Sequence, residues 1–181
     1  MRLNSTTSAS FAFRLVASSL LALALSLAAA PAQAQEQGKY GNDLSLYVGS
    51  MLPNQIEGVT EILPVFGGRY AFTSSIGALE VGGANTHALG VDWTTLEVSL
   101  RGEIPVGEGL SGLIYFGPSF HYYTAAWETE RKSETGIHAG AAGMMLVADT
   151  LWLRADLKFM GNPGTGMYLL FGLVFRGTGG N

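Results

Sequence analysis

Short segments in which apolar and polar side chains alternate constrain the fold of this chain more than any other feature. The segment Leu151–Met160 reads LWLRADLKFM, with an apolar residue at every odd position and Arg154, Asp156 and Lys158 at even ones. Because successive side chains of a β-strand point to opposite faces, this pattern predicts a strand with one apolar and one polar face. Residues 95–104 repeat the pattern.

Turn residues divide the chain from residue 43 to residue 176 into eight such segments. Helical periodicity is nearly absent, so we expect an all-β fold. Each segment has about 9–14 residues, which is long enough to cross a bilayer as a tilted strand. The predicted strands are 43–52, 61–73, 76–84, 91–104, 110–123, 134–147, 151–160 and 166–176.

The composition is less charged than that of a typical soluble domain. Hydrophobic residues make up 48 % of the chain and charged residues 13 %, whereas soluble domains average about 25 % charged residues. After residue 34 no apolar run is long enough for a membrane helix. These properties favour a membrane barrel whose apolar face meets lipid and whose polar face fills the lumen. The alternative is a soluble secreted barrel or sandwich with an apolar ligand pocket.

The N-terminal segment has the layout of a secretory signal peptide. Arg2 and Arg14 precede an apolar run over residues 15–30, and Pro31-Ala32-Gln33-Ala34 fits a small-x-small cleavage site. We therefore expect a signal peptide over 1–34, cleaved after Ala34, a barrel over 35–176 and a short polar tail over 177–181. The cleaved chain would carry 8 basic and 14 acidic residues, which argues against a nucleic-acid partner.

The connections and hairpins are mutually consistent. With a periplasmic N-terminus, connections 53–60, 85–90, 124–133 and 161–165 would lie outside the cell, and the shorter 74–75, 105–109 and 148–150 in the periplasm. A two-residue turn at 74–75 would place Arg69 opposite Glu80. A turn centred on Gly107 would place Leu100 opposite Ile114. A turn around Pro163 would place Leu157 opposite Leu169.

The final strand resembles the C-terminal assembly signal of outer-membrane barrels, which is an aromatic residue preceded by apolar residues at every second position. Here the positions are Met167, Leu169, Phe171, Leu173 and Phe175. In that family the aromatic residue is usually the last of the chain, whereas here residues 176–181 (RGTGGN) follow it.

Residues 40–176 as a whole resemble the OmpA- and OmpX-type barrels of Gram-negative bacteria. The resemblance implies an eight-stranded antiparallel up-and-down transmembrane β-barrel in the outer membrane. Its partners would be outer-membrane lipid and the barrel assembly machinery. The resemblance rests on architecture and carries no catalytic motif, and it implies no cofactor.

The charged residues on the inward faces are expected to form an ion-pair network that fills the lumen. An eight-stranded barrel is just wide enough inside for side chains, and unpaired charges there would be costly. The alternative is a narrow pore for ions or small solutes. The residues concerned are Arg69, Glu80, Glu97, Arg101, Glu103, Arg154, Asp156 and Lys158.

Two histidines and one serine could carry chemistry on the same face. A hairpin centred near residues 129–130 would place His121 opposite His138, but two ligands without cysteine make a weak metal site, so we expect no metal. Ser119 and His121 with Glu134 would suit a lipid-modifying hydrolase. An inward set is poorly placed for lipid, so we expect no enzyme.

The longest polar loop is the remaining candidate for a functional surface. We expect this loop to project outside the cell and to contact an unknown surface ligand. Its candidate contact residues are Trp127, Glu128, Glu130, Arg131 and Lys132.

Overall fold

A computed structural model describes residues 40–74 and 76–178 of the 181-residue chain. The predicted signal peptide, its cleavage site at Ala34 and the last three residues of the predicted tail lie outside the described residues. Residues 177 and 178, which we expected in the tail, belong to the last strand.

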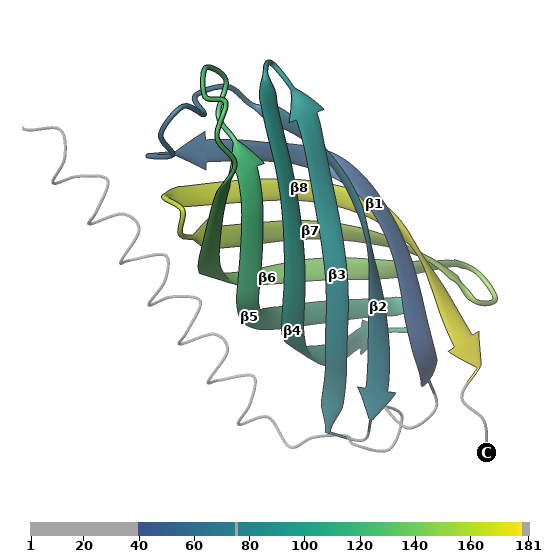
Figure 1. Ribbon diagram of the computed structural model, residues 1–181. Helices are drawn as coiled ribbons and strands as arrows, with labels where there is room; N and C mark the ends of the chain where they lie inside the picture. The colour runs from purple at the N-terminus through teal and green to yellow at the C-terminus, as the bar shows by residue number, and fades with distance from the viewer. Residues whose placement is uncertain (1–39, 75, 179–181) are drawn as a thin grey trace, which may run out of the picture. The chain divides into compact units, whose positions relative to one another are not determined.

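Eight antiparallel strands form one closed barrel in the order β1-β2-β3-β4-β5-β6-β7-β8, with β8 paired to β1 (Figure 1). This confirms the predicted fold. Within residues 40–74 and 76–178, no helix is long and apolar enough to cross a membrane. The strands are β1 (Tyr40–Asn54), β2 (Leu63–Ser74), β3 (Gly77–Ala88), β4 (Val91–Gly107), β5 (Leu110–Thr124), β6 (Lys132–Ala148), β7 (Leu151–Gly161) and β8 (Thr165–Thr178).

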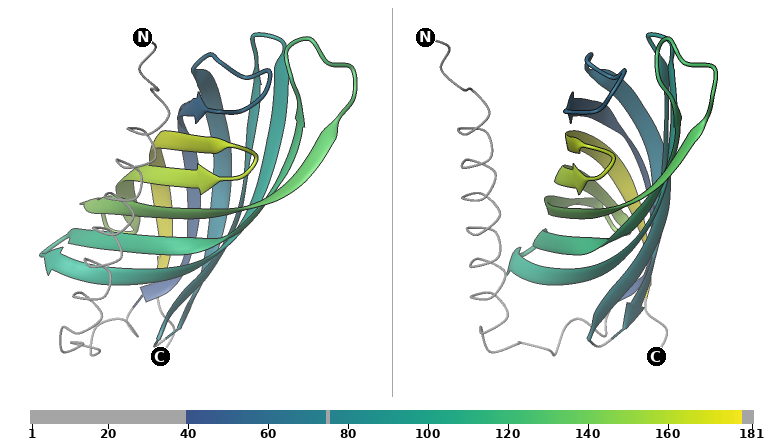
Figure 2. Two further views of the ribbon diagram at one scale, coloured as in Figure 1. Left: turned by 90° about the vertical axis from the view of Figure 1, so that its left-hand side faces the viewer. Right: turned by 60° about the vertical axis from the view of Figure 1, so that its left-hand side comes forward.

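The two ends of the barrel differ in their connections. One end, called here the terminal end, carries residues 40 and 178 and the short connections β2–β3, β4–β5 and β6–β7. The other, called the loop end, carries the first loop (residues 55–62), the second (89–90), the third (125–131) and the fourth (162–164). Figure 2 shows that strands on opposite walls cross at a steep angle, as expected when strands tilt to close a small barrel.

Burial alternates along the strands as the period-2 pattern predicts. On β7, Arg154, Asp156 and Lys158 are buried inside the barrel, whereas Leu153 and Leu157 are exposed on its outer surface. The core of the molecule is therefore the polar face of the sheet, and the apolar face looks outward. This is the reverse of a soluble protein, in which polar faces meet water.

Two strands run three or four residues further at their C-terminal ends than predicted. β3 continues to Ala88, so the predicted loop 85–90 shrinks to Leu89-Gly90, and β4 continues through the predicted turn at 105–109 as far as Gly107. The polar sequence of residues 85–88 indicated a loop, but Thr86 points inward and its hydroxyl donates to the carbonyl of Pro64 on β2.

The β2–β3 register differs from the prediction by two residues. Arg69 lies opposite Gly82, and Glu80 lies opposite Ala71, so Arg69 and Glu80 are not cross-strand neighbours. The cause is that Ser74 pairs with Gly77, so the hairpin is centred one residue later than predicted, and a shift of the centre by one residue moves each pair by two. A two-residue shift leaves every side chain on its predicted face.

The other two predicted registers had different outcomes. Leu100 lies opposite Phe116 and not Ile114, because the β4–β5 turn lies at residues 108–109 and the register shifts between Pro105 and Gly107. Leu157 lies opposite Leu169, as predicted from the turn around Pro163.

Candidate functional site: the filled lumen

The eight charged residues assigned to the inner face by sequence all lie inside the barrel, and each belongs to at least one ion pair. Seven of them are buried and Glu103 is partly exposed. They come from β2, β3, β4 and β7 and, in chain order, are Arg69, Glu80, Glu97, Arg101, Glu103, Arg154, Asp156 and Lys158.

Glu80 on β3 is the acceptor at the centre of this network. Its Oε2 accepts from Nη1 of Arg154 at 2.8 Å and from Nη1 of Arg101 at 3.2 Å. Nε of Arg69 lies 3.7 Å from its Oε1. β3 and β7 are four strands apart in the ring, so the Arg154–Glu80 pair spans the full width of the lumen.

A second carboxylate, Asp156 on β7, joins two of the same guanidinium groups. It accepts from Arg69 Nη1 at 2.9 Å and from Arg154 Nη2 at 2.8 Å. The Arg69 guanidinium lies 4.3 Å from the ring centroid of Tyr47 and 5.5 Å from that of Tyr115. Aromatic faces attract a cation more strongly where water is excluded, so the two tyrosines add to the stabilisation of this charge.

Lys158 and Glu97 form a separate ion pair nearer the loop end. The Lys158 ammonium group on β7 donates to Glu97 on β4 and lies 4.0 Å from the ring centroid of Tyr168. Close by in the network, the hydroxyl of Ser99 and Nε2 of His138 are hydrogen-bonded at 2.8 Å.

Asp43 and Arg176 complete the network and were not among the predicted residues. Asp43 on β1 accepts from Arg101 Nη2 at 2.6 Å and from Arg176 Nε at 2.9 Å. Arg176 on β8 also donates to both oxygens of Glu103, at 2.9 Å each. The Asp43–Arg176 pair joins the first strand to the last where the barrel closes. The contacts with Arg101 and Glu103 join both of these strands to β4.

A signal for both residues was present in the sequence. Asp43 shares its parity with buried Ser45, and Arg176 shares its parity with buried Val174. Both lie at the predicted strand ends, where alternation is hardest to read. With them the lumen holds five basic and five acidic residues, so its charges balance.

Apolar side chains fill the lumen beyond the ion pairs, towards the loop end. We call this layer the apolar cap. Trp93 on β4 stacks on Tyr123 on β5, with ring centroids 4.5 Å apart. Residues 56 and 59 of the first loop fold over the same layer, and both are buried. The cap consists of Tyr47, Met51, Ile56, Val59, Leu63, Val65, Ala84, Val91, Trp93, Tyr123, Met160, Tyr168 and Leu170.

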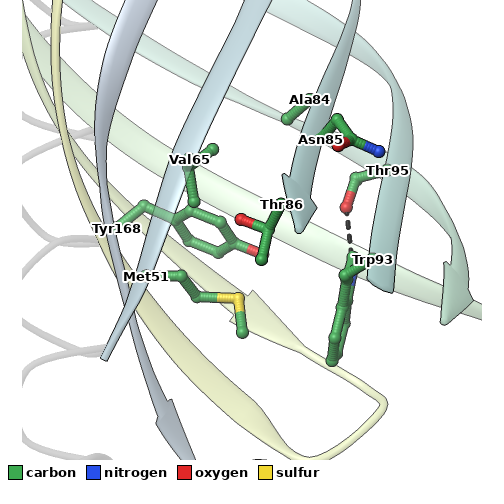
Figure 3. A pocket seen from close by; sticks show the side chains of 8 residues that line it. All are labelled: Met51, Val65, Ala84, Asn85, Thr86, Trp93, Thr95 and Tyr168. Atoms are coloured by element: carbon green, nitrogen blue, oxygen red, sulfur yellow. Dashed lines mark hydrogen bonds between the residues drawn. The ribbon is translucent and has the colours of Figure 1, made fainter. Parts of the chain in front are cut away.

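Figure 3 shows a small pocket at the inner boundary of the cap. Tyr168 and Met51 lie on one side of it and Trp93 on the other, and the Trp93 indole N–H donates to Thr95 Oγ1 at 3.0 Å. The pocket is lined by Met51, Val65, Ala84, Asn85, Thr86, Trp93, Thr95 and Tyr168.

Known structures share this architecture, although no family model and no curated protein sequence matches the chain. The N-terminal β-barrel domain of Pseudomonas aeruginosa OprF aligns with a TM-score of 0.61 and 14 % identity, over 77 % of this chain and 100 % of that one. Neisserial surface protein A aligns with a TM-score of 0.58 and 8 % identity, over 76 % and 96 %. Ail, the attachment invasion locus protein of Yersinia pestis, aligns with a TM-score of 0.53 and 13 % identity, over 77 % and 99 %.

This is the fold of the OmpA- and OmpX-type barrels. The predicted fold family is therefore correct. At these identities the likeness extends to the fold alone, so the role of the barrel has to be argued from its own residues.

The two inward histidines of this barrel do not face each other. His121 lies opposite Glu134, and His138 lies opposite Gly117. The predicted pairing was wrong by four residues, because the β5–β6 hairpin is centred between residues 127 and 128 and not near residues 129–130. Among the described residues, no group of three or more histidine, aspartate and glutamate side chains is arranged to hold a metal ion.

Ser119 and His121 are in contact, but the pair is not set up for nucleophilic catalysis. Ser119 Oγ lies 2.8 Å from His121 Nε2, and the Trp93 indole N–H donates to Nδ1 of the same ring at 3.3 Å. A neutral imidazole that accepts a hydrogen bond at Nδ1 carries its proton on Nε2. A general base for Ser119 would need Nε2 without a proton, because Nε2 is the nitrogen that faces the serine. Glu134 accepts from Tyr123 and does not orient the histidine.

The predicted loop residues lie at the loop end. Lys132 Nζ is 2.9 Å from Glu128, and Arg131 is 3.5 Å from Asp92 beside the second loop. Trp127 and Glu130 are exposed.

The predicted assembly positions lie on the outer face of β8. Phe171 is 63 % exposed, and its four companions alternate with buried inward residues. The strand pairs with β1 along its whole length. The positions are Met167, Leu169, Phe171, Leu173 and Phe175.

Proposed function

We propose that the protein is an integral outer-membrane β-barrel whose lumen is closed by side chains, and that it serves as a scaffold for its loop end, not as a pore. The observation that carries this proposal is the set of ion pairs joining opposite walls, above all Arg154–Glu80. A side-chain pair that spans the full width leaves an ion no path around it in so narrow a barrel.

The outer surface supports a membrane location. Leucine, valine and phenylalanine side chains project outward around the barrel, with Leu46, Phe66, Leu100, Phe116 and Phe171 all more than half exposed. A soluble protein rarely exposes so large a contiguous apolar surface, whereas a bilayer covers it. With a signal peptide cleaved after Ala34, lipid as solvent and assembly machinery acting on β8, the location would be the outer membrane of a Gram-negative cell.

Two unlike barriers in series support a closed lumen. The ionic network would hold a passing ion electrostatically, and the apolar cap would strip its hydration shell. Either barrier by itself opposes conduction, and the first loop covers the cap at residues 56 and 59. A narrow pore, the alternative function, would require both layers to move.

Conductance and gel mobility test the proposal together. The refolded protein should migrate differently when boiled and unboiled, as a closed detergent-resistant barrel does, and should give no single-channel steps in a planar bilayer. Steady single-channel steps from protein with native gel mobility would contradict the closed lumen. Identical mobility with and without boiling, in protein that stays soluble without detergent, would contradict the membrane location.

A lipid-modifying hydrolase is not proposed for this barrel. Ser119 is buried inside the lumen beside His121, whose Nδ1 accepts from Trp93, and no acid among the described residues hydrogen-bonds to that ring. Incubation of the folded barrel with lipid A should leave the lipid's mass unchanged. Loss of an acyl chain that disappears in a Ser119→Ala variant would contradict this statement.

A further inference from the structure

Two large apolar side chains project from neighbouring loops at the loop end. Trp127 in the third loop is 72 % exposed, and Leu89 at the tip of the β3–β4 turn is 64 % exposed. The loops touch between them, because a Cβ built at Gly90 would lie 3.5 Å from Cα of Ala126. Each apolar residue is thus one position from the contact, and the pair forms one patch, called here the tip patch.

The third loop is fixed to the first, so the tip patch is held in place before any partner arrives. The backbone N–H of Ala126 donates to the carbonyl of Gly58 at 3.4 Å. A Cβ at Gly58 would lie 2.4 Å from that of Ala125, so only glycine allows this approach. Lys132 adds an ion pair to Glu57 at 3.8 Å. Preorganised loops lose little entropy on binding, which favours recognition.

The backbone at Leu89 adds a separate argument. Its φ is +55° and that of Gly90 is +78°, so both central residues of this two-residue turn are left-handed. Asparagine or glycine is the usual choice at the first of these positions, and a branched apolar residue there costs free energy. An exposed leucine recovers little of that cost from burial within its own chain. Contact with a partner would account for the choice.

The charge around the tip patch is negative. Residues 55–62, 87–92 and 124–134 contain six acidic and two basic residues, an excess of four negative charges. Both basic residues are engaged, Arg131 with Asp92 and Lys132 with Glu128. Glu61 and Glu130 are exposed, and neither takes part in an ion pair among the described residues. The acidic residues are Glu57, Glu61, Asp92, Glu128, Glu130 and Glu134.

We propose that the loop end binds a basic polypeptide segment that carries apolar side chains. Trp127 and Leu89 contact the apolar side chains, and the surrounding carboxylates attract the lysines and arginines. A cation over the Trp127 ring gains a further attraction. The inference rests on the proposed function, because it requires the loop end to face away from the cell.

Charge decides between this partner and the other candidates. A sulfated polysaccharide or a phosphate-rich lipid surface would meet an excess of carboxylates and be repelled. A neutral bilayer would take Trp127 and Leu89 but would gain nothing from the carboxylates. A basic segment is the partner that uses both the apolar and the acidic part of the surface.

The protein carries its own probe for the test. Of its three tryptophans, Trp93 and Trp152 are buried inside the barrel and Trp127 is exposed. The barrel is placed in phosphatidylcholine nanodiscs and titrated with a peptide of alternating lysine and leucine. Trp127 fluorescence should shift to the blue and become protected from acrylamide. Peptides with glutamate for lysine, or with serine for leucine, should have no effect, and empty nanodiscs are the blank.

Four variants, followed by anisotropy of the labelled peptide, locate the site. Trp127→Ala should weaken binding by about tenfold or more, as expected for a central aromatic contact. Glu61→Lys with Glu130→Lys should weaken it about tenfold, with the largest effect at low salt. Glu108→Lys, a single charge reversal of the same kind at the terminal end, should leave binding unchanged. Leu89→Asn should weaken binding without destabilising the barrel, because asparagine suits the turn.

Three results would overturn the proposal. The first is equal binding of the lysine and glutamate peptides. The second is equal loss of binding in Glu108→Lys and in the loop-end double variant. The third is quenching of Trp127 by brominated lipid, together with its protection from acrylamide, in the absence of peptide. That result would place the tip patch in the bilayer. If the barrel has native gel mobility and no conductance but gives any of these three results, this inference is wrong. The proposed function is then unaffected.

Discussion

The ionic network and the apolar cap fill one lumen by opposite physical means. In the network, side chains from walls far apart in the ring meet as buried ion pairs, and the charges balance within the layer. In the cap, aromatic and aliphatic side chains pack as they would in a soluble core. Buried ion pairs contribute little net stability but fix geometry, whereas buried apolar surface stabilises without specifying partners.

The difference teaches why each layer lies where it does. The network joins opposite walls across the middle of the barrel and holds them at a set separation. The cap lies under the loops, where residues 56 and 59 can fold over it and exclude water from the pairs below. The stability of the cap does not depend on any single side chain. The stability of the network does, because each charge needs its partner. The following variants test this contrast.

Glu80→Ala should have the largest effect, because it leaves three guanidinium groups with one acceptor fewer. Arg69, Arg101 and Arg154 all lie within ion-pair distance of Glu80. Removal of one partner of a buried network costs about 3–5 kcal/mol. Urea unfolding in lipid vesicles, followed by gel mobility, measures the free energy of unfolding. A loss below about 1 kcal/mol, the level of an exposed pair, would mean that water already shields the network.

Leu63→Ala in the cap should cost somewhat less. Leu63 is fully buried at the start of β2, and its truncation leaves a cavity among the cap side chains. Such substitutions cost about 2–5 kcal/mol, depending on how far the neighbouring side chains relax into the space. The same unfolding measurement applies, with exposed Ile62→Ala as the neighbouring control. An equal effect at the two positions would show that the cap is not packed as a core.

Lys158→Met and Glu97→Leu separate the two kinds of stabilisation within one pair. Either single substitution leaves a buried charge without its partner and should cost about 3–5 kcal/mol. The double variant replaces the pair by apolar groups continuous with the cap, and it should recover most of that loss. A double-mutant cycle gives the coupling energy. Additive losses would show that the two charges do not depend on each other.

Lys132→Ala should have the smallest effect on the barrel. Its partners Glu57 and Glu128 are solvent-accessible, and exposed ion pairs contribute about 0–1 kcal/mol. The free energy of unfolding should change by less than that of Leu63→Ala. A loss as large as that of Glu80→Ala would mean that the third loop supports the cap.

Local information in the sequence was strong, and information about strand pairing was weak. Alternation placed all eight predicted charges on the correct face, and it predicted the strand count and the closed barrel. It failed at residues 85–88, where polar side chains concealed the end of β3. It also misplaced the opposite partner of His121, because a loop length decides the register of everything behind it.

What the sequence determined by itself was therefore the face on which each side chain lies, since the period of a strand is a property of adjacent residues. Only the tertiary structure decided which charges meet. Arg69 and Asp156, or Asp43 and Arg176, are brought together by ring closure and strand tilt, over separations of 87 and 133 residues. No local pattern encodes such distances, and a register shift of two preserves every face while it changes every partner.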